Sequence, residues 1–575
     1  MALINADCLV ASIKPAKAML WLATMFCVSA CGNQAQGDSR VEYPSLGSAV
    51  NNARSYPVTA STQTLKCTVD FNSNLGQINP NIFGTNLEWF NEGGGLSSHD
   101  QDLKAKLALL TKQQGVTVMR YPGGTLADFY HWQDGIGDIN KRPKRHHPTD
   151  PGSSENGFGS PEFFQFLKTT NSHGLITVNA GTADAKEAAD WVAYANQPNH
   201  PQRLNDGLIA PANIKLWEIG NELYFPGNPG EQIITTTPEE YSKRYLAFSR
   251  AMKAVDPSIT TIAIGTAKSH IGPDTQFQDW TEVLLKNAAS EIDMIAVHNA
   301  YFPILYQNKQ PPVESVYPAL WASPEAVDRS LTTLEKLIGK YETTKKIGVA
   351  ITEWGVLFSF PNVDNYWLDH VKTMGSGVYV GRMLQVMMSH ERVQLANYFK
   401  LSDRSFMGWI NFNGEPKVPY WVFALYANNT GDTRLSATVA SPTYSTTSIG
   451  IVAAENKVPE VTVVSSKDSK TGKVYINLVN RSMTTSYPVH LDLQNFNVAQ
   501  KIKVLRVQAP EMTSHNGRDI PPELPYDIAY EPYSTVDANS IKIKETTQDI
   551  NQAVVIAPFS VLTVVLENST QTIKK

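Results

Sequence analysis

Two glutamates stand where expected strands end, and together they have the residue types needed for acid–base chemistry. Glu222 closes the run 214–222, and Glu353 lies near the end of the run 346–355. Burying a charged carboxylate without a partner costs several kcal/mol, so such residues are poor choices for packing. Retaining hydrolysis of a glycosidic bond needs a pair of carboxyl groups roughly 5 Å apart, one acid/base and one nucleophile. We therefore take Glu222 and Glu353 as candidate catalytic residues; the alternative is that both form surface salt bridges.

Eight strand-like runs alternate with helical patterns through the middle of the chain. Several runs are continuously apolar at their centres, which is typical of parallel strands buried on both faces. This eightfold alternation predicts an α/β protein with a (β/α)8 TIM barrel, whose active site lies at the C-terminal ends of the strands. An open doubly wound sheet is the alternative, but no glycine-rich phosphate loop follows the first run. The runs are 81–90, 117–124, 174–181, 214–222, 259–267, 292–301, 346–355 and 394–401.

From about residue 416 the pattern changes to short runs of alternating apolar and polar residues, separated by turn signals. This pattern predicts a C-terminal antiparallel β-sandwich domain. The alternating run 64–70 precedes the barrel, contains Cys67 and is expected to pair into the same sandwich. The expected domains are thus an N-terminal strand region at 65–80, the catalytic barrel at 81–415 and the sandwich at 416–575.

The N-terminal residues 1–30 have the pattern of a secretory signal. Two lysines precede the apolar run 18–30, which is shorter than the about 20 residues that a membrane-spanning helix needs. The run ends in Val28-Ser-Ala-Cys31, which resembles the lipobox of bacterial lipoproteins, and residues 31–64 are polar enough for a flexible tether. We expect export and anchoring through lipidated Cys31 to a bacterial membrane, the outer membrane or otherwise the periplasmic side. The alternative is an exported protein cleaved nearby.

Composition and charge narrow the classes of partner. The chain has 575 residues, 42% of them hydrophobic, and a formal net charge of −5. The aromatic and apolar content argues against disorder, and the acidic balance argues against a nucleic-acid partner. The histidines show no metal-ligand spacing, so we expect no metal and no cofactor. The oligomeric state stays open.

Several motifs carry a resemblance to a known family. Asn221-Glu222 on the fourth run and Glu353 on the seventh are similar to the large clan of retaining glycoside hydrolases with (β/α)8 barrels. Within that clan the chain resembles the α-L-arabinofuranosidases of glycoside hydrolase family 51 over about residues 66–566. The motifs are Ile78-Asn-Pro-Asn-Ile-Phe-Gly-Thr-Asn-Leu-Glu88, Arg120-Tyr-Pro-Gly-Gly124, Tyr130-His-Trp-Gln-Asp-Gly-Ile-Gly137 and Trp217-Glu-Ile-Gly-Asn-Glu-Leu-Tyr224.

The resemblance implies catalytic roles for four residues. Glu222 would be the acid/base, and Glu353 would be the nucleophile. Asn221 would hydrogen-bond the sugar 2-hydroxyl, and Arg120 would steady the nucleophile. A carboxylate near a second carboxylate raises the pKa of one of them, so a single proton would serve the pair.

The resemblance also implies a set of sugar-binding residues. Glu88 would bind hydroxyls of the sugar in the −1 subsite, and Trp354 is expected to stack on a sugar face. Tyr301 matches more loosely, because two residues separate it from His298 where the family usually has one.

Three residues depart from the family pattern and bear on specificity. Thr125 stands where many members have an asparagine, and Thr352 replaces the more usual aspartate before the nucleophile. Lys400 stands where the family usually has glutamine. Lys400 would either face an acidic group of the substrate or pair with a neighbouring acid such as Glu88.

The sequence therefore predicts a retaining glycoside hydrolase that releases terminal α-L-arabinofuranosyl residues from poly- or oligosaccharides by double displacement. One alternative is the same mechanism on another glycan, as an endo-β-glycanase or as an exo-enzyme for another sugar, an acidic one included. A second alternative is a glycan-binding lipoprotein without catalysis.

Overall fold

The computed structural model describes most of the chain after residue 56. The described residues are 57–89, 91–96, 101–146, 153–154, 156–225, 234–267, 279–298, 304–305, 312–358, 370–403, 407–411, 414–450, 452–516, 535–536 and 540–569. The expected leader and Cys31 lie outside these ranges. Part of the expected tether is ordered, because strand β1 (Thr59–Ala60) pairs with a strand of the C-terminal sheet. Within the described ranges, no helix has both the length and the apolar character to cross a bilayer.

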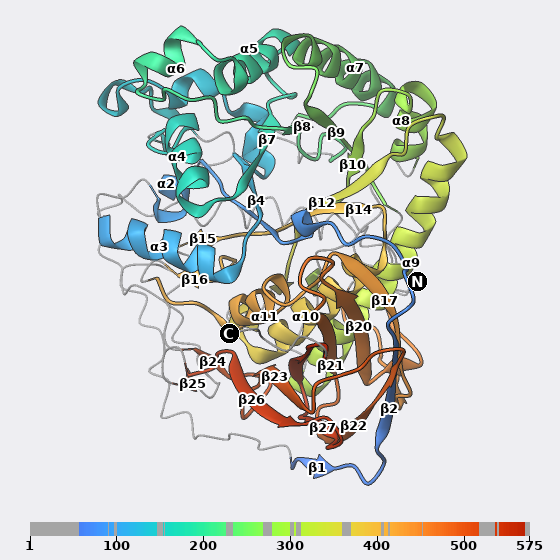
Figure 1. Ribbon diagram of the computed structural model, residues 1–575. Coiled ribbons are helices and arrows are strands. Elements are labelled where there is room, and N and C mark those ends of the chain that lie inside the picture. Colours follow the sequence, from blue (N-terminus) through green and yellow to red (C-terminus); the bar gives the residue numbers. More distant parts are fainter. Residues whose placement is uncertain are drawn as a thin grey trace, which may run out of the picture.

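Eight parallel strands close into a barrel, in which neighbours in the chain are neighbours in space. This confirms the predicted (β/α)8 architecture, seen in the upper half of Figure 1. Each strand is shorter than its predicted run, because residues at the ends of the runs form the loops of the barrel mouth. The strands are β3 (Gly84–Asn86), β4 (Val118–Tyr121), β7 (His173–Val178), β8 (Leu216–Ile219), β9 (Thr260–Ile264), β10 (Met294–Ala296), β12 (Gly348–Trp354) and β14 (Val393–Tyr398).

Helices surround the barrel, and local capping signals fix several of their starts. Thr237 and Glu240 form a capping box at the start of α7, and Asp184 accepts a backbone N–H at the start of α5. Helix α9 begins at Val313 and continues through two prolines. The helices are α2 (Asn91–Gly95), α3 (Gln101–Gln114), α4 (Ser160–Thr170), α5 (Ala185–Asn196), α6 (Pro201–Asn205), α7 (Pro238–Val255), α8 (Trp280–Ala288), α9 (Val313–Tyr341), α10 (Met374–Ser389) and α11 (Val418–Ala427).

Inside the barrel, side chains form an apolar layer with a polar layer above it. Successive side chains of a strand point to opposite faces, so Leu216 and Glu218 point inward while Trp217 and Ile219 pack toward the helices. The apolar layer consists of Val118, Leu175, Leu216, Ile262, Met294, Ala296, Ala350 and Leu395. Two residues further along β4, β7, β8 and β12 stand Arg120, Thr177, Glu218 and Thr352, all fully buried. The fold therefore places a charged layer directly beneath the barrel mouth.

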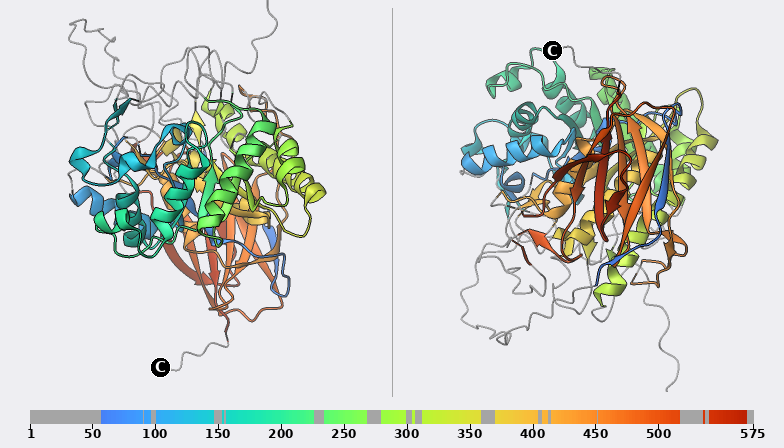
Figure 2. Two further views of the ribbon diagram at one scale, coloured as in Figure 1. Left: turned by 90° about the horizontal axis from the view of Figure 1, so that it is seen from above. Right: turned by 60° about the horizontal axis from the view of Figure 1, so that its bottom comes forward.

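The C-terminal part is a large, mostly antiparallel sheet, as the sequence predicts. Strand β2, from before the barrel, lies between β22 and β17, parallel to β22 and antiparallel to β17 (Figure 2). Cys67 is buried there, and burial raises the pKa of its thiol to about 12. The sheet runs in the order β1, β22 (Thr485–Gln494), β2 (Leu65–Asp70), β17 (Thr433–Val439), β20 (Val461–Lys467), β21 (Val474–Asn480), β28 (Ser560–Leu566), β23 (Lys501–Val507) and β26 (Lys544–Asp549), with β27 (Val554–Ile556) beside β22.

Helices α10 and α11 lie between the barrel and this sheet (Figure 1). Helix α11 follows the eighth barrel strand and contacts α10 and α3, so the barrel helices extend past the expected boundary at residue 416. The remaining strands form two-residue pairs in the connections: β5 (Arg145–His146) with β6 (Ser153–Ser154), β11 (Ile304–Leu305) with β13 (Leu357–Phe358), β15 (Ser402–Asp403) with β16 (Ile410–Asn411), β18 (Thr443–Tyr444) with β19 (Val458–Pro459), and β24 (His515–Asn516) with β25 (Thr535–Val536).

Candidate active site

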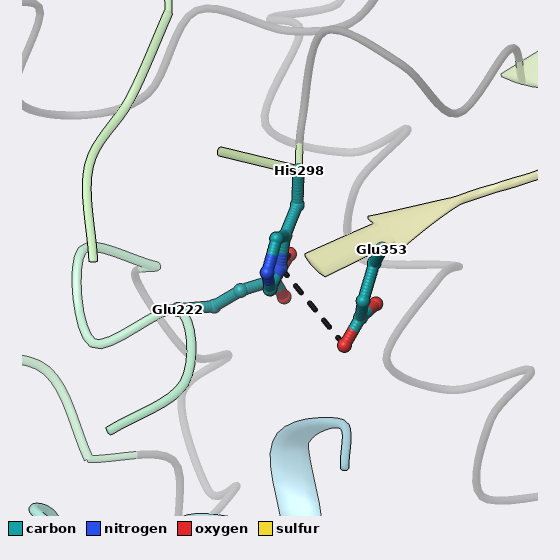
Figure 3. Close-up of side chains that lie close together, drawn as sticks. All are labelled: Glu222, His298 and Glu353. Atoms are coloured by element: carbon teal, nitrogen blue, oxygen red, sulfur yellow. Dashed lines mark hydrogen bonds and ion pairs between the residues drawn. The ribbon is translucent and has the colours of Figure 1, made fainter. Parts of the chain in front are cut away.

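The two candidate catalytic glutamates meet at the barrel mouth. Glu222 follows β8 on a left-handed backbone with φ of 39°, and Glu353 is the last but one residue of β12. One carboxylate oxygen of each lies within 4.8 Å of the other and of a ring nitrogen of His298. Figure 3 shows the three side chains pointing toward one another. The side chain of Glu222 is 25% exposed and that of Glu353 is 10% exposed, so they do not form the surface salt bridges of the alternative interpretation.

Arg120 lies beneath the pair and connects three groups of the site. Its guanidinium donates to Glu353 Oε1 at 2.7 Å, to Asn221 Oδ1 at 2.7 Å and to Glu218 Oε2 at 2.6 Å. Burial alone would lower the pKa of Arg120, but the charges of Glu218 and Glu353 raise it above its usual value. Arg120 is therefore a permanent cation that holds both Glu353 and the Asn221 side chain in place.

The turn that carries Asn221 is held by a buried aspartate, Asp128, which belongs to none of the sequence motifs named above. Asp128 accepts the backbone N–H of Asn221 at 2.9 Å and that of Ala180 at 3.2 Å. Burial raises the pKa of Asp128 to about 7, although the two hydrogen bonds by themselves would lower it. The amide Nδ2 of Asn221 is buried and has no hydrogen-bond partner within the described ranges.

A second buried carboxylate, Glu218, lies behind the pair. It accepts hydrogen bonds from Thr177 Oγ1 at 2.7 Å and from Thr352 Oγ1 at 2.6 Å, besides its ion pair with Arg120. Burial raises the pKa of Glu218, but Arg120, His298 and the Thr352 hydroxyl outweigh this effect and lower it to about 2. The sequence offered one signal for this residue, since Glu218 shares strand parity with Glu222.

His298 links the buried layer to Glu222. Its Nε2 lies 2.6 Å from Thr352 Oγ1, and its Nδ1 lies 3.1 Å from Glu222 Oε1. Burial lowers the pKa of this imidazole, but the surrounding charges of Glu353, Glu218 and Glu222 raise it to about 9. Glu222, His298 and Glu353 also have the residue types of metal ligands, and one ligand atom of each lies within 4.8 Å of the others.

Glu88 and Lys400 form an ion pair at the first and eighth strands. Lys400 Nζ lies 2.5 Å from Glu88 Oε2, and the two side chains are 10% and 12% exposed. The Phe399–Lys400 peptide bond is cis. Of the two arrangements that the sequence left open for Lys400, the structure shows the pairing with Glu88.

Trp354 and Tyr301 are two further residues that the sequence predicts to bind sugar. Trp354 is fully buried and packs edge-to-face against Tyr398, with ring centroids 5.1 Å apart. Stacking on a sugar requires an accessible ring face, which Trp354 does not present here, and its role in sugar binding stays a prediction. Tyr301 lies outside the described residues.

Comparisons with known proteins agree with the motifs. The family model of the α-L-arabinofuranosidase 1 domain matches residues 111–300, and that of the α-L-arabinofuranosidase C-terminal domain matches residues 352–542. An intracellular exo-α-(1→5)-L-arabinofuranosidase from Halalkalibacterium halodurans is 25% identical over 487 residues, covering 80% of this chain and 93% of the relative. An exo-α-(1→6)-L-arabinofuranosidase from Bifidobacterium longum is 26% identical over 448 residues, covering 72% and 82%.

The solved structures show the same fold. The thermostable GH51 α-L-arabinofuranosidase from Thermotoga petrophila superposes with a TM-score of 0.73 at 23% identity, covering 88% of this chain and all of that one. These relatives are named as enzymes and give no support to the alternative of a glycan-binding lipoprotein without catalysis.

The expected localisation needs correction. Export and lipid anchoring were inferred from residues 1–31 alone, yet several relatives, the Halalkalibacterium halodurans enzyme among them, are named intracellular arabinofuranosidases. A short apolar run ending in a cysteine is a weak signal, because thirteen residues of common types specify little. The prediction of an exported, lipid-anchored protein is therefore contradicted.

The paired strand-end carboxylates, the barrel that positions them and the matches on both halves of the chain lead to one assignment. The chain is a glycoside hydrolase that resembles the α-L-arabinofuranosidases of glycoside hydrolase family 51 along most of its length.

Proposed function

We propose that the protein is a retaining, exo-acting α-L-arabinofuranosidase that releases terminal arabinofuranosyl residues by double displacement. The observation that carries the proposal is the approach of Glu222 and Glu353, whose nearest oxygens lie within 4.8 Å. Retaining enzymes place their two carboxyl groups about 5–5.5 Å apart, whereas inverting enzymes leave about 6.5–9.5 Å for a water molecule. The separation favours direct attack by one carboxylate on the sugar.

In the first step Glu353 acts as the nucleophile and Glu222 as the acid. Glu353 must be ionised to attack the anomeric carbon, and burial opposes this by raising its pKa. The charges of His298 and Arg120 work against that rise, and Arg120 donates to the attacking carboxylate from 2.7 Å. Glu222, the more exposed of the two, faces the mouth and delivers a proton to the leaving oxygen.

In the second step Glu222 acts as the base and Glu353 is the leaving group. The ester formed on Glu353 carries no charge, and Glu222, which has already given its proton to the leaving oxygen, is now a carboxylate that can act as a base. Glu222 then takes a proton from water, which attacks the anomeric carbon and frees Glu353. The configuration at that carbon is inverted twice and so retained.

The choice of sugar rests on the hydroxyl-binding groups and on the relatives. Asn221 and Glu88 supply a donor and an acceptor at the barrel mouth, as a neutral polyhydroxylated sugar requires. Because Lys400 already pairs with Glu88, its charge is neutralised, which favours a neutral pentose over an acidic sugar. The relatives are named for α-(1→5) and α-(1→6) linkages, so both are candidates here.

The test is hydrolysis of an aryl α-L-arabinofuranoside and of α-(1→5)- and α-(1→6)-linked arabino-oligosaccharides, followed by proton NMR. We expect single arabinose units as the product and the α-anomer as the species formed first. Release of long oligosaccharides would show endo action instead, and first formation of the β-anomer would show an inverting mechanism.

Two variants separate the roles of the carboxylates. Glu353→Ala should lose activity by a factor of about 10⁴ or more, and azide should restore turnover to give a glycosyl azide of inverted configuration. Glu222→Ala should retain activity on aryl glycosides with good leaving groups and lose about 10²–10⁴-fold on alkyl or sugar aglycones. An equal loss of activity by Glu222→Ala on every leaving group would contradict its assignment as the acid.

A further inference from the structure

The hydrogen bonds behind the catalytic pair form one directed chain. The pKa of Glu218 lies at about 2, so this residue is a carboxylate that only accepts. Thr352 must therefore donate its single hydroxyl proton to Glu218 Oε1. The oxygen of Thr352 then accepts from His298, which places a proton on Nε2 of the ring.

The direction of this chain determines what His298 presents to Glu222. With Nε2 protonated, Nδ1 faces Glu222 Oε1 at 3.1 Å as either the donor of an imidazolium or the acceptor of a neutral ring. In both cases one proton is shared between Nδ1 and the Glu222 carboxyl group. The other tautomer of the neutral ring, with Nδ1–H and bare Nε2, would leave Thr352 without a donor.

Among the described residues, the groups that interact with His298 are three carboxylates and the hydroxyl of Thr352, which itself donates to a carboxylate. Glu218 and Glu222 come from β8 and the turn after it, and Glu353 and Thr352 come from β12. Glu353 Oε1 lies 3.9 Å from Nδ1, further than Glu222 Oε1. Nε2 of His298 also lies 3.9 Å from Glu218 Oε1, and the hydroxyl of Thr352 provides the shorter, hydrogen-bonded link between the imidazole and this buried anion.

We propose that Glu218 and Thr352 are positioning residues that, through this chain, fix the Nε2–H form of His298 and so control the proton held between His298 and Glu222. The carboxylate at the end of this chain is supplied from strand β8 by Glu218. The inference rests on the proposed function of Glu222 as acid/base. Its first test observes the His298 ring directly and needs no turnover of substrate.

The test uses the full-length protein labelled with ¹³C- and ¹⁵N-histidine. In Thr352→Val, which keeps the shape of the side chain, the ring should lose its fixed tautomer, and the His298 pKa should fall by about one unit or more. Thr352→Ser restores the hydroxyl and should restore the signal. Thr177→Val removes another hydroxyl from Glu218 without touching His298 and should leave the His298 tautomer as in the wild type. A His298→Gln variant identifies the resonance.

Activity gives the second readout. Thr352→Val should lower kcat about 10- to 100-fold on substrates with poor leaving groups and far less on those with good ones, because only the former need the proton of Glu222. An unchanged His298 tautomer and pKa in Thr352→Val would overturn the proposal. A wild-type enzyme with a fixed Nε2–H tautomer but no arabinofuranosidase activity would instead refute the proposed function alone.

Discussion

At the scale of single residues, the role of Lys400 bears on whether the enzyme prefers neutral or acidic sugars. Its ammonium group is largely buried and lies 2.5 Å from Glu88. A buried pair of this kind keeps both partners charged and in fixed geometry, and removing one partner leaves the other uncompensated. We therefore expect Lys400 to orient Glu88 rather than to bind an anion of the substrate.

Lys400→Gln should lower kcat/KM about 10-fold or more on neutral arabinofuranosides and reduce activity on every other substrate by a similar factor, because Glu88 loses its partner. The double variant Lys400→Gln/Glu88→Gln should lose less than the sum of the single changes, with a coupling of about 0.5–3 kcal/mol. Steady-state kinetics on neutral and uronic-acid-bearing glycans measure both the loss in kcat/KM and the coupling between the two changes. A selective loss on the acidic glycans would show that Lys400 reads a substrate anion.

At the scale of elements, the junction of α9 and α10 depends on a charged histidine. His390 caps the C-terminal end of α10, and its two ring nitrogens lie 3.0 Å from Asp328 and 3.1 Å from Glu335 of α9. Burial lowers the pKa of His390, but these two carboxylates raise it to about 9. The imidazolium therefore ties the two helices together while it is protonated.

The stabilisation by His390 should depend on pH. Because its pKa is raised on folding, the contribution is complete below the unfolded value near 6.5 and is lost as the pH rises through about 9. His390→Gln should be less stable than the wild type by about 1–2 kcal/mol at pH 6, after allowance for the exposure of Asp328. The difference should shrink above pH 9.5, as urea unfolding at both pH values will measure. A difference that does not change with pH would contradict an ionic role.

At the scale of the whole molecule, the barrel and the C-terminal sheet share one core. Buried residues of the sheet, Val479 and Val561 among them, belong to the same hydrophobic cluster as the barrel helices. Gly381 of α10 lets the helix approach the sheet, because an added Cβ would lie 3.1 Å from Val561 and 3.2 Å from Val479. The two parts should therefore unfold as one cooperative unit.

Gly381→Leu should destabilise the protein by about 1–3 kcal/mol, because the larger side chain forces α10 away from the sheet. The matched control is Gly339→Ala in α9, where an added Cβ meets nothing within 4 Å. That change should stabilise the protein by about 0.5–1 kcal/mol through helix propensity alone. Calorimetry should show a single transition in each variant, shifted down for Gly381→Leu and up for Gly339→Ala. Two separate transitions in the wild type would contradict the shared core.

The sequence by itself determined the eight barrel strands, their order and the pair Glu222 and Glu353. It could do so because buried parallel strands are continuously apolar, helix caps are local, and a motif keeps its spacing whatever surrounds it. The same local reasoning misled for the N-terminal run, where a few residues of common types carry little information.

Only the tertiary structure decided which residues from distant strands share the polar layer. Glu353 and Thr352 are adjacent and should point to opposite faces of β12, yet both reach the site, because the pairing of β12 with β14 shifts register between Ile351 and Trp354. A register shift depends on how two strands pair, which neither strand's sequence specifies alone. For the same reason the contacts of Glu218 with Arg120 and Thr352, and of Lys400 with Glu88, follow from closure of the barrel, which joins residues 98 to 312 positions apart in the chain.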